Sequence, residues 1–139
     1  MRSVGLDTSV VLRLLIQDPT DQADLAKEKV DLAFKLKRRV FVSDLVVSEV
    51  YYGLQHHYDV PKAEAKQTLI RLLDSKKINP EKNGKALLAL KDDEKSGGAG
   101  LVDRMIALQN LDSTHETLTF DKKMSKVTGC ILVNKYEVK

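Results

Sequence analysis

Hydrophobic and polar positions along the chain predict short strands that alternate with helices. The first apolar run, Val4 to Leu6, stops at Asp7 and is followed by two hydroxyl residues and by helical spacing of apolar residues over 10–15. This pattern predicts a buried strand that is followed directly by a helix. The same reasoning predicts, in order, a helix over 21–36, a strand over 40–42, a helix capped by Ser43 or Asp44, a helix over 61–74, a short edge strand over 76–79, helices over 81–95 and 101–111, and strands over 116–120 and 130–133.

Apolar residues recur on one side of several predicted helices, and we expect these sides to face the core. The members are Ala23, Ala26, Val30, Ala33 and Phe34 in the second helix, Val46, Val50, Gly53 and Leu54 in the third, and Leu101, Val102, Met105, Ile106 and Leu108 in the last. Glu49 borders the apolar stripe of the third helix. It is therefore expected to face the edge of the packed side rather than open water.

Strands that alternate with helices at these lengths predict an α/β fold, with a mostly parallel sheet of about four to five short strands and helices on both faces. The length of 139 residues suits a single domain over residues 1–139.

Composition narrows the class of protein. A hydrophobic fraction of 42% and a charged fraction of 31% are ordinary for a soluble globular protein, and no apolar run is long enough to span a membrane. Asp7 interrupts the only N-terminal apolar stretch, so we expect no signal peptide and a cytoplasmic location. The net charge of +3 and the pI near 8.9 permit a polyanionic partner without requiring one. The single cysteine, Cys130, lies in an apolar run and is expected to be a reduced core residue.

Two polar stretches precede the last long helix. Asp92 to Lys95 is interpreted as a solvated charge cluster. Ser96 to Gly100 is rich in glycine, but it lacks both the Gly-Lys-Ser/Thr ending and the Gly-x-Gly-x-x-Gly spacing of phosphate-binding loops. We interpret it as a hinge or connection.

Four acidic residues stand out by their positions. Asp7 and Asp121 each end a predicted strand, while Glu49 and Asp103 lie in the opening turns of predicted helices. In a parallel sheet, strand ends and helix starts of this kind line one crevice, so all four acids would point into it. Each also has an ordinary alternative role as a helix cap, a partner of a helix dipole or a surface acid.

A cluster of four carboxylates requires a cation. Two carboxylates about 4 Å apart repel by roughly 4 kcal/mol at an effective dielectric constant near 20. Oxygen ligands favour Mg²⁺ or Mn²⁺ over zinc, and the chain has neither a group of cysteines nor a spaced pair of histidines. His56 and His57 are adjacent on a helix and point in different directions, and His115 stands alone.

Four short motifs in order give the chain a family resemblance. They are Leu6 to Arg13, Val47 to Val50, Leu101 to Ala107 and Leu118 to Asp121, and the resemblance that they carry spans nearly the whole chain. The chain resembles the PIN-domain ribonucleases and, within them, the small VapC-type toxins. It departs from the pattern at Ser9, where family members often have Asn, and at Gly100, where many have a further acid.

The resemblance implies a site and an activity. Asp7, Glu49, Asp103 and Asp121 would be the catalytic, metal-binding acids, with Thr8, Ser9 and Thr119 as supporting hydroxyls. The activity would be hydrolysis of RNA phosphodiester bonds with Mg²⁺ or Mn²⁺. A VapC-type toxin would form a homodimer and would be inhibited by a cognate antitoxin protein.

Four cations lie close in sequence to the acids, and they are candidates to hold RNA phosphates or to be solvated surface charges: Arg13, Arg104, Lys122 and Lys123.

Other functions have less support in the sequence. An aspartyl phosphotransferase characteristically has a second acid two residues after its nucleophile, but that position is Ser9 here. A dinucleotide-binding module lacks its glycine fingerprint. A PIN-type nuclease of RNA processing or turnover without an antitoxin remains an alternative, as does a PIN-like domain that binds RNA or protein without cleaving.

Overall fold

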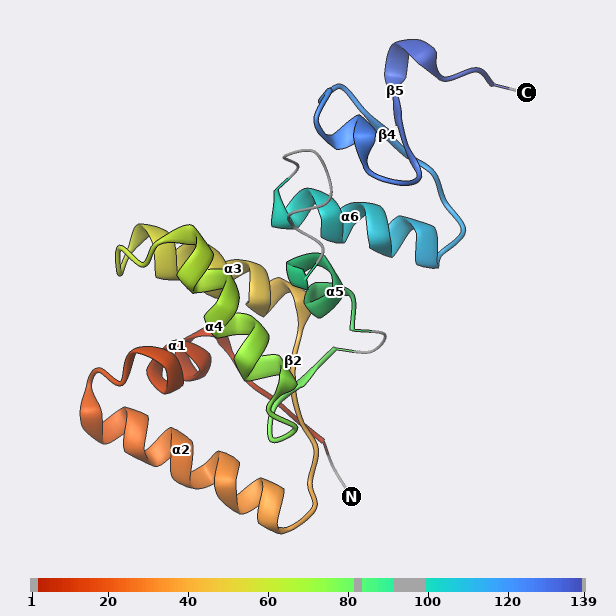
Figure 1. Ribbon diagram of the computed structural model, residues 1–139. Coiled ribbons are helices and arrows are strands. Elements are labelled where there is room, and N and C mark those ends of the chain that lie inside the picture. The colour runs from red at the N-terminus through yellow and green to blue at the C-terminus, as the bar shows by residue number, and fades with distance from the viewer. Residues whose placement is uncertain (1–2, 82–83, 92–99, 139) are drawn as a thin grey trace. The chain divides into compact units, whose positions relative to one another are not determined.

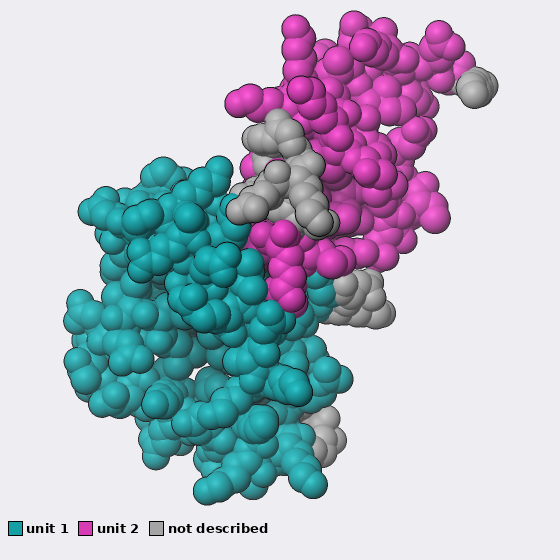
Figure 2. All heavy atoms as spheres, viewed as in Figure 1, with its two compact units in different colours: residues 1–84 teal, residues 85–139 magenta. Residues whose placement is uncertain are grey.

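The computed structural model describes residues 3–81, 84–91 and 100–138, and it has the predicted α/β class. The described elements are β1 (Val4–Gly5), α1 (Thr8–Ile16), α2 (Thr20–Lys35), β2 (Val40–Val42), α3 (Asp44–His56), α4 (Lys62–Asp74), β3 (Asn79–Pro80), α5 (Lys85–Lys91), α6 (Leu101–Asp112), β4 (Thr117–Thr119), the 3-10 helix η2 (Met124–Lys126), β5 (Cys130–Leu132) and the 3-10 helix η3 (Val133–Lys135) (Figure 1). The chain divides into two compact units, unit 1 over residues 1–84 and unit 2 over residues 85–139 (Figure 2).

Unit 1 is built on a three-stranded parallel sheet with the order β1-β2-β3. Val4 pairs with Val40, Phe41 pairs with Asn79, and the backbone N–H of Leu6 donates to the carbonyl of Phe41 at 2.9 Å. Helix α1 packs on α2 and α3, and α3 packs on α4. Because the strands are parallel, their carboxyl ends lie along one edge of the sheet, which we call the carboxyl edge, and their amino ends lie along the other, the amino edge.

Local sequence explains where the helices of unit 1 begin. Asp7 caps α1, and the hydroxyl of Ser43 caps α3 by accepting from the backbone N–H of Val46 at 3.2 Å. Pro19 and Pro61 immediately precede α2 and α4, as expected for residues that suit the start of a helix. Pro80 lies inside β3 rather than after the strand, and an edge strand tolerates it because its missing N–H is not needed by a neighbour.

Unit 2 contains a two-stranded parallel sheet in which Thr117 pairs with Cys130 and Thr119 pairs with Leu132. Gly129 precedes β5 with a φ of +82°, and its carbonyl accepts the backbone N–H of Thr117 at 2.9 Å. A Cβ at this position would meet Cδ2 of Leu111 at 2.6 Å. The turn into β5 therefore requires glycine, both for its backbone conformation and for the space that α6 occupies.

Several expected core positions are exposed. Strand β1 was predicted to be buried, but Val4 is 44% exposed because β1 lies at an edge of its sheet. Phe34, expected on the packed side of α2, is also 44% exposed. Val102 and Ile106 are exposed because α6 buries a neighbouring stripe that includes Leu101 and Met105. Cys130 is a free cysteine of intermediate burial rather than a core residue.

The helix predicted over 81–95 is α5, which begins only at Lys85 in the described part of the chain. Glu81 lies outside it. The predicted charge cluster Asp92 to Lys95 and most of the predicted connection Ser96 to Gly100 lie outside the described residues.

Within residues 3–81, 84–91 and 100–138, no helix has the length and apolar character to cross a membrane.

Candidate active site

Asp7 lies where the sequence placed it, directly after β1 and at the start of α1. Its Oδ1 accepts the backbone N–H of Thr8 at 2.8 Å, and the residue is exposed to solvent. Asp7 is thus a helix cap, as the alternative interpretation held. It is also an accessible carboxylate at the carboxyl edge of a parallel sheet, so capping does not prevent the carboxylate from meeting a ligand.

The two hydroxyls that follow Asp7 have different surroundings. Thr8 Oγ1 is buried, and among the described residues it has no hydrogen-bond partner. Ser9 is exposed and lines a hollow of about 500 Å³ between β1, α1 and α2, together with apolar residues such as Val10 and Val30. The supporting role of the Thr8 and Ser9 hydroxyls therefore stays a prediction.

Glu49 is exposed on α3, so the expectation that it would not face open water is wrong, although it does border the packed side of the helix. Helix α3 turns Val47, Val50 and Leu54 inward, with none of them more than 1% exposed. Residues three and four apart share a helix face, so Glu49 lies on the side of the buried Gly53 and away from Val47 and Leu54. Its carboxylate is therefore accessible without a change in the fold of unit 1.

Two acids that the sequence analysis did not treat as site residues lie at the same carboxyl edge. Asp44 follows β2 and is only 5% exposed. Glu81 follows β3, and its Oε2 accepts the backbone N–H of Asp44 at 2.9 Å. Glu81 also lines a hollow of about 370 Å³ with Leu6, Phe41 and Ser43. Position after a predicted strand, the signal used for Asp7, would have found both.

Asp103 lies in the first turn of α6 in unit 2 and is half-buried. Its charge acts on Cys130. Burial is the main cause that raises the pKa of the Cys130 thiol, a side-chain hydrogen bond with Thr117 lowers it, and the negative charge of Asp103 raises it further. Asp103 is therefore close enough to the β4 and β5 sheet for its charge to be felt there.

Asp121 follows β4 and caps the turn that leads into η2. Its Oδ1 accepts the backbone N–H groups of Lys123 at 2.8 Å and Met124 at 3.3 Å. The hydroxyl of Thr119 accepts the backbone N–H of Asp121 at 3.0 Å. Thr119 thus helps to fix the backbone of Asp121, one of the four candidate acids. Asp121 itself remains exposed.

The four predicted phosphate contacts differ in accessibility. Arg104 is 3% exposed, so the expectation of a solvent-facing cation is wrong, because α6 turns this side chain inward with Leu101 and Met105. Lys122 and Lys123 are exposed. Arg13 donates from Nε to Oε1 of Gln22 on α2 at 2.7 Å.

The donor set suits a hard cation, because the four acids offer only carboxylate oxygens and hydroxyl residues adjoin Asp7 and Asp121. Asp7 and Glu49 belong to unit 1, and Asp103 and Asp121 belong to unit 2. Among the described residues, no group of three or more His, Cys, Asp or Glu side chains stands in a position to hold a metal ion.

The comparison with known families decides the identity. The family model for the PIN domain matches residues 4–129, which is most of the chain and includes all four acids. The chain belongs to the PIN domain family. PIN domains are generally nucleases, and those nucleases typically use divalent metals. No curated protein and no solved structure matches this PIN-domain chain.

Proposed function

We propose that this PIN-domain protein is a Mg²⁺- or Mn²⁺-dependent ribonuclease, with Asp7, Glu49, Asp103 and Asp121 as its metal-binding acids. The observation that carries the proposal is the family match across residues 4–129, which contain an acid at each of the four motif positions. Solvent exposure of Asp7, Glu49 and Asp121 supports it, since a ligand can reach their carboxylates without unfolding either unit.

The divalent ion would supply an activated water and would stabilise negative charge on the phosphoryl oxygens. The protein's own groups would then do the remaining work. Asp7 stays fixed by its bond to the backbone of Thr8, and Thr119 fixes the backbone of Asp121. Exposed Lys122 and Lys123 would contact the phosphates on either side of the reacting one. No side chain needs to act as a covalent nucleophile.

We further propose that the protein is the toxin of a VapBC-type pair, that it forms a homodimer and that it is inhibited by an antitoxin. Repulsion within a group of carboxylates favours a blocking segment that carries an Arg or Lys, because such a cation neutralises the acids but supplies no activated water. Co-purification with the product of an adjacent small gene would support this assignment. A monomer that binds no such product, and whose expression leaves growth unchanged, would contradict it and would leave the nuclease proposal intact.

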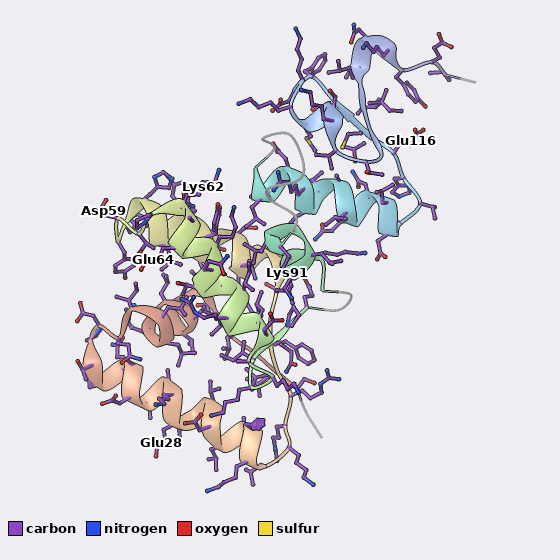
Figure 3. All side chains as sticks on the ribbon, in the orientation of Figure 1. Glu28, Asp59, Lys62, Glu64, Lys91 and Glu116 are labelled. Carbon is purple, nitrogen blue, oxygen red and sulfur yellow. The ribbon has the colours of Figure 1, made fainter. Side chains whose placement is uncertain are left out.

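The nuclease proposal is tested by cleavage of RNA by the purified full chain. We expect cleavage with Mg²⁺ or Mn²⁺, none in excess chelator, and a loss of at least about a hundredfold in Asp103→Asn, because loss of transition-state charge stabilisation has effects of this size. Glu28→Gln is the matched control, since Glu28 is an exposed acid on α2 that points away from α1 (Figure 3). Equal cleavage with and without chelator would overturn the proposal.

A further inference from the structure

A strongly basic hollow lies at the amino edge of the sheet in unit 1. Its volume is about 400 Å³, and its other lining residues are Phe34 and Asn79. Six cations line it, and we call the set the basic hollow: Lys35, Lys37, Arg38, Arg39, Lys76 and Lys77. The chain has 23 lysines and arginines in all, so about a quarter of them line this one hollow.

The basic hollow and the acids of unit 1 lie at opposite edges of the same sheet. Lys35 to Arg39 precede β2, and Lys76 and Lys77 precede β3. Asp7 and Glu81, by contrast, follow β1 and β3. Strands of two or three residues span roughly 10 Å at about 3.3 Å per residue, so the two edges are separate but close. A nucleic-acid strand of several nucleotides can therefore reach both.

The basic hollow keeps a large positive charge even when the nearby helix dipoles and the neighbouring acid Asp31 are taken into account. Helices α2 and α4 end beside it, and their dipoles contribute about half a negative charge each. Lys77 pairs with Asp31 at 2.9 Å, but both side chains are more than 40% exposed, so solvent weakens the pair. The other five cations make no ion pair with an acid in the described part of the chain. Like charges held together in this way favour an anionic ligand.

Two of these lysines have left-handed backbone conformations at the ends of helices. Lys37 and Lys76 are the second residues after the ends of α2 and α4, and both have positive φ, at 59° and 69°. Glycine is the favoured residue at this position, because a Cβ is strained there. A cation after a helix C-terminus interacts favourably with the helix dipole, but neighbouring cations such as Arg38 and Lys77 could make that interaction. Positive φ also occurs near the ends of other helices, at Gln17, Asp59 and Thr114. This conformation is therefore common in the chain, and at Lys37 and Lys76 it coincides with a charge at the hollow.

An exposed aromatic ring at the hollow favours a nucleic acid over another anion. Phe34 lines the hollow and is 44% exposed, with Nζ of Lys77 5.8 Å from its ring centre. Cations mixed with exposed aromatic rings are typical of grooves that bind single-stranded nucleic acid, where phosphates meet the cations and bases stack on the rings.

We propose that the basic hollow binds backbone phosphates of single-stranded RNA, as a binding site separate from the catalytic acids. This inference rests on the proposed function for its choice of RNA. The hollow holds the strand by sequence-independent contacts, so it contributes affinity for long substrates and leaves the chemistry at the carboxyl edge unchanged.

The test measures binding of a 20-nucleotide RNA to the full chain in chelator, where no metal-dependent cleavage occurs. Each lost phosphate contact on a single strand reduces the slope of log K against log salt by about 0.7. Lys37→Gly combined with Lys76→Gly should therefore weaken binding and reduce the slope by about 1.4. The melting temperature should be equal to that of the parent or higher, because glycine relieves the strained backbone. Lys37→Gln with Lys76→Gln removes the same charges and should weaken RNA binding equally.

The matched control is Lys27→Gln with Lys62→Gln, which removes two exposed lysines from the same helices, α2 and α4. Lys62 lies at the start of α4, the end opposite Lys76 (Figure 3). The proposal predicts that this control changes the slope by less than half as much. Equal slopes for hollow and control variants would overturn it. Tighter binding of a poly-glutamate peptide or of phosphatidylglycerol vesicles than of RNA to the hollow would also overturn the proposal.

Failure of this proposal is distinguishable from failure of the proposed function. If the hollow binds RNA and the enzyme is a nuclease, the Lys37→Gly, Lys76→Gly variant should show a raised KM on the 20-nucleotide RNA and an unchanged kcat/KM on a dinucleotide. Absence of metal-dependent cleavage contradicts the nuclease alone, because the binding measurement in chelator does not depend on it.

Discussion

Oε2 of Glu81 accepts the backbone N–H of Asp44 at 2.9 Å, which ties the residue after β3 to the first residue of α3. The contact joins positions 37 residues apart in the sequence. A carboxylate at a helix N-terminus also meets the positive end of the helix dipole.

Removing this contact should destabilise unit 1. Glu81→Ala is expected to lower the free energy of unfolding by about 1 kcal/mol, because a helix-capping interaction is lost. Urea denaturation of the full chain measures the change. Glu28→Ala, at an exposed position inside α2, should change it by less than about 0.5 kcal/mol. Equal stability of the two variants would mean that the Glu81 contact contributes nothing.

Asp7 caps α1 and is also proposed to bind the metal ion, and substitutions can separate the two roles. Asp7→Ala should lower the free energy of unfolding by about 1 kcal/mol, because α1 loses its cap, whereas Asp7→Asn should leave it nearly unchanged, because Asn caps equally well. Thermal melts in chelator test this difference. Mg²⁺ should then stabilise the parent more than Asp7→Asn. A loss in Asp7→Asn as large as that in Asp7→Ala would show that the carboxylate itself is required for folding.

Asp103 should control the reactivity of Cys130. Its negative charge raises the pKa of the thiol, so Asp103→Asn should lower that pKa and increase the thiolate fraction at any pH below it. The rate of alkylation by iodoacetamide in chelator, measured against pH, gives the pKa. Glu116→Gln is the control, since Glu116 is an exposed acid beside β4 (Figure 3) and is not among the groups that shift the Cys130 pKa. Unchanged alkylation in Asp103→Asn would contradict this electrostatic link.

The sequence predicted those features that depend on neighbouring residues. Asp7 and Ser43 cap helices because a capping side chain acts on N–H groups one to three residues away. The order of strands and helices follows from periodicity, which is also local. The α/β class and the PIN family were predicted on this basis.

Features that depend on packing between distant segments were not predicted. Exposure of Glu49 depends on which face of α3 the rest of unit 1 covers, and burial of Arg104 depends on which face of α6 is covered. Glu81 was assigned to the helix over 81–95, whereas its contact with the backbone of Asp44 joins positions 37 residues apart. The basic hollow was likewise missed, since its two parts are almost 40 residues apart and each alone resembles an ordinary cationic helix end.

The central claim is that this PIN-domain protein binds a divalent ion through its motif acids, and titration of the full chain with Mn²⁺ tests it most directly. Calorimetry on the parent, Asp7→Asn and Asp103→Asn should show one class of site in the parent and a loss of affinity of about tenfold or more in each variant, because each removes a charged ligand. Lys27→Gln should bind as the parent does. Parent-like Mn²⁺ affinity in both acid variants would contradict the claim.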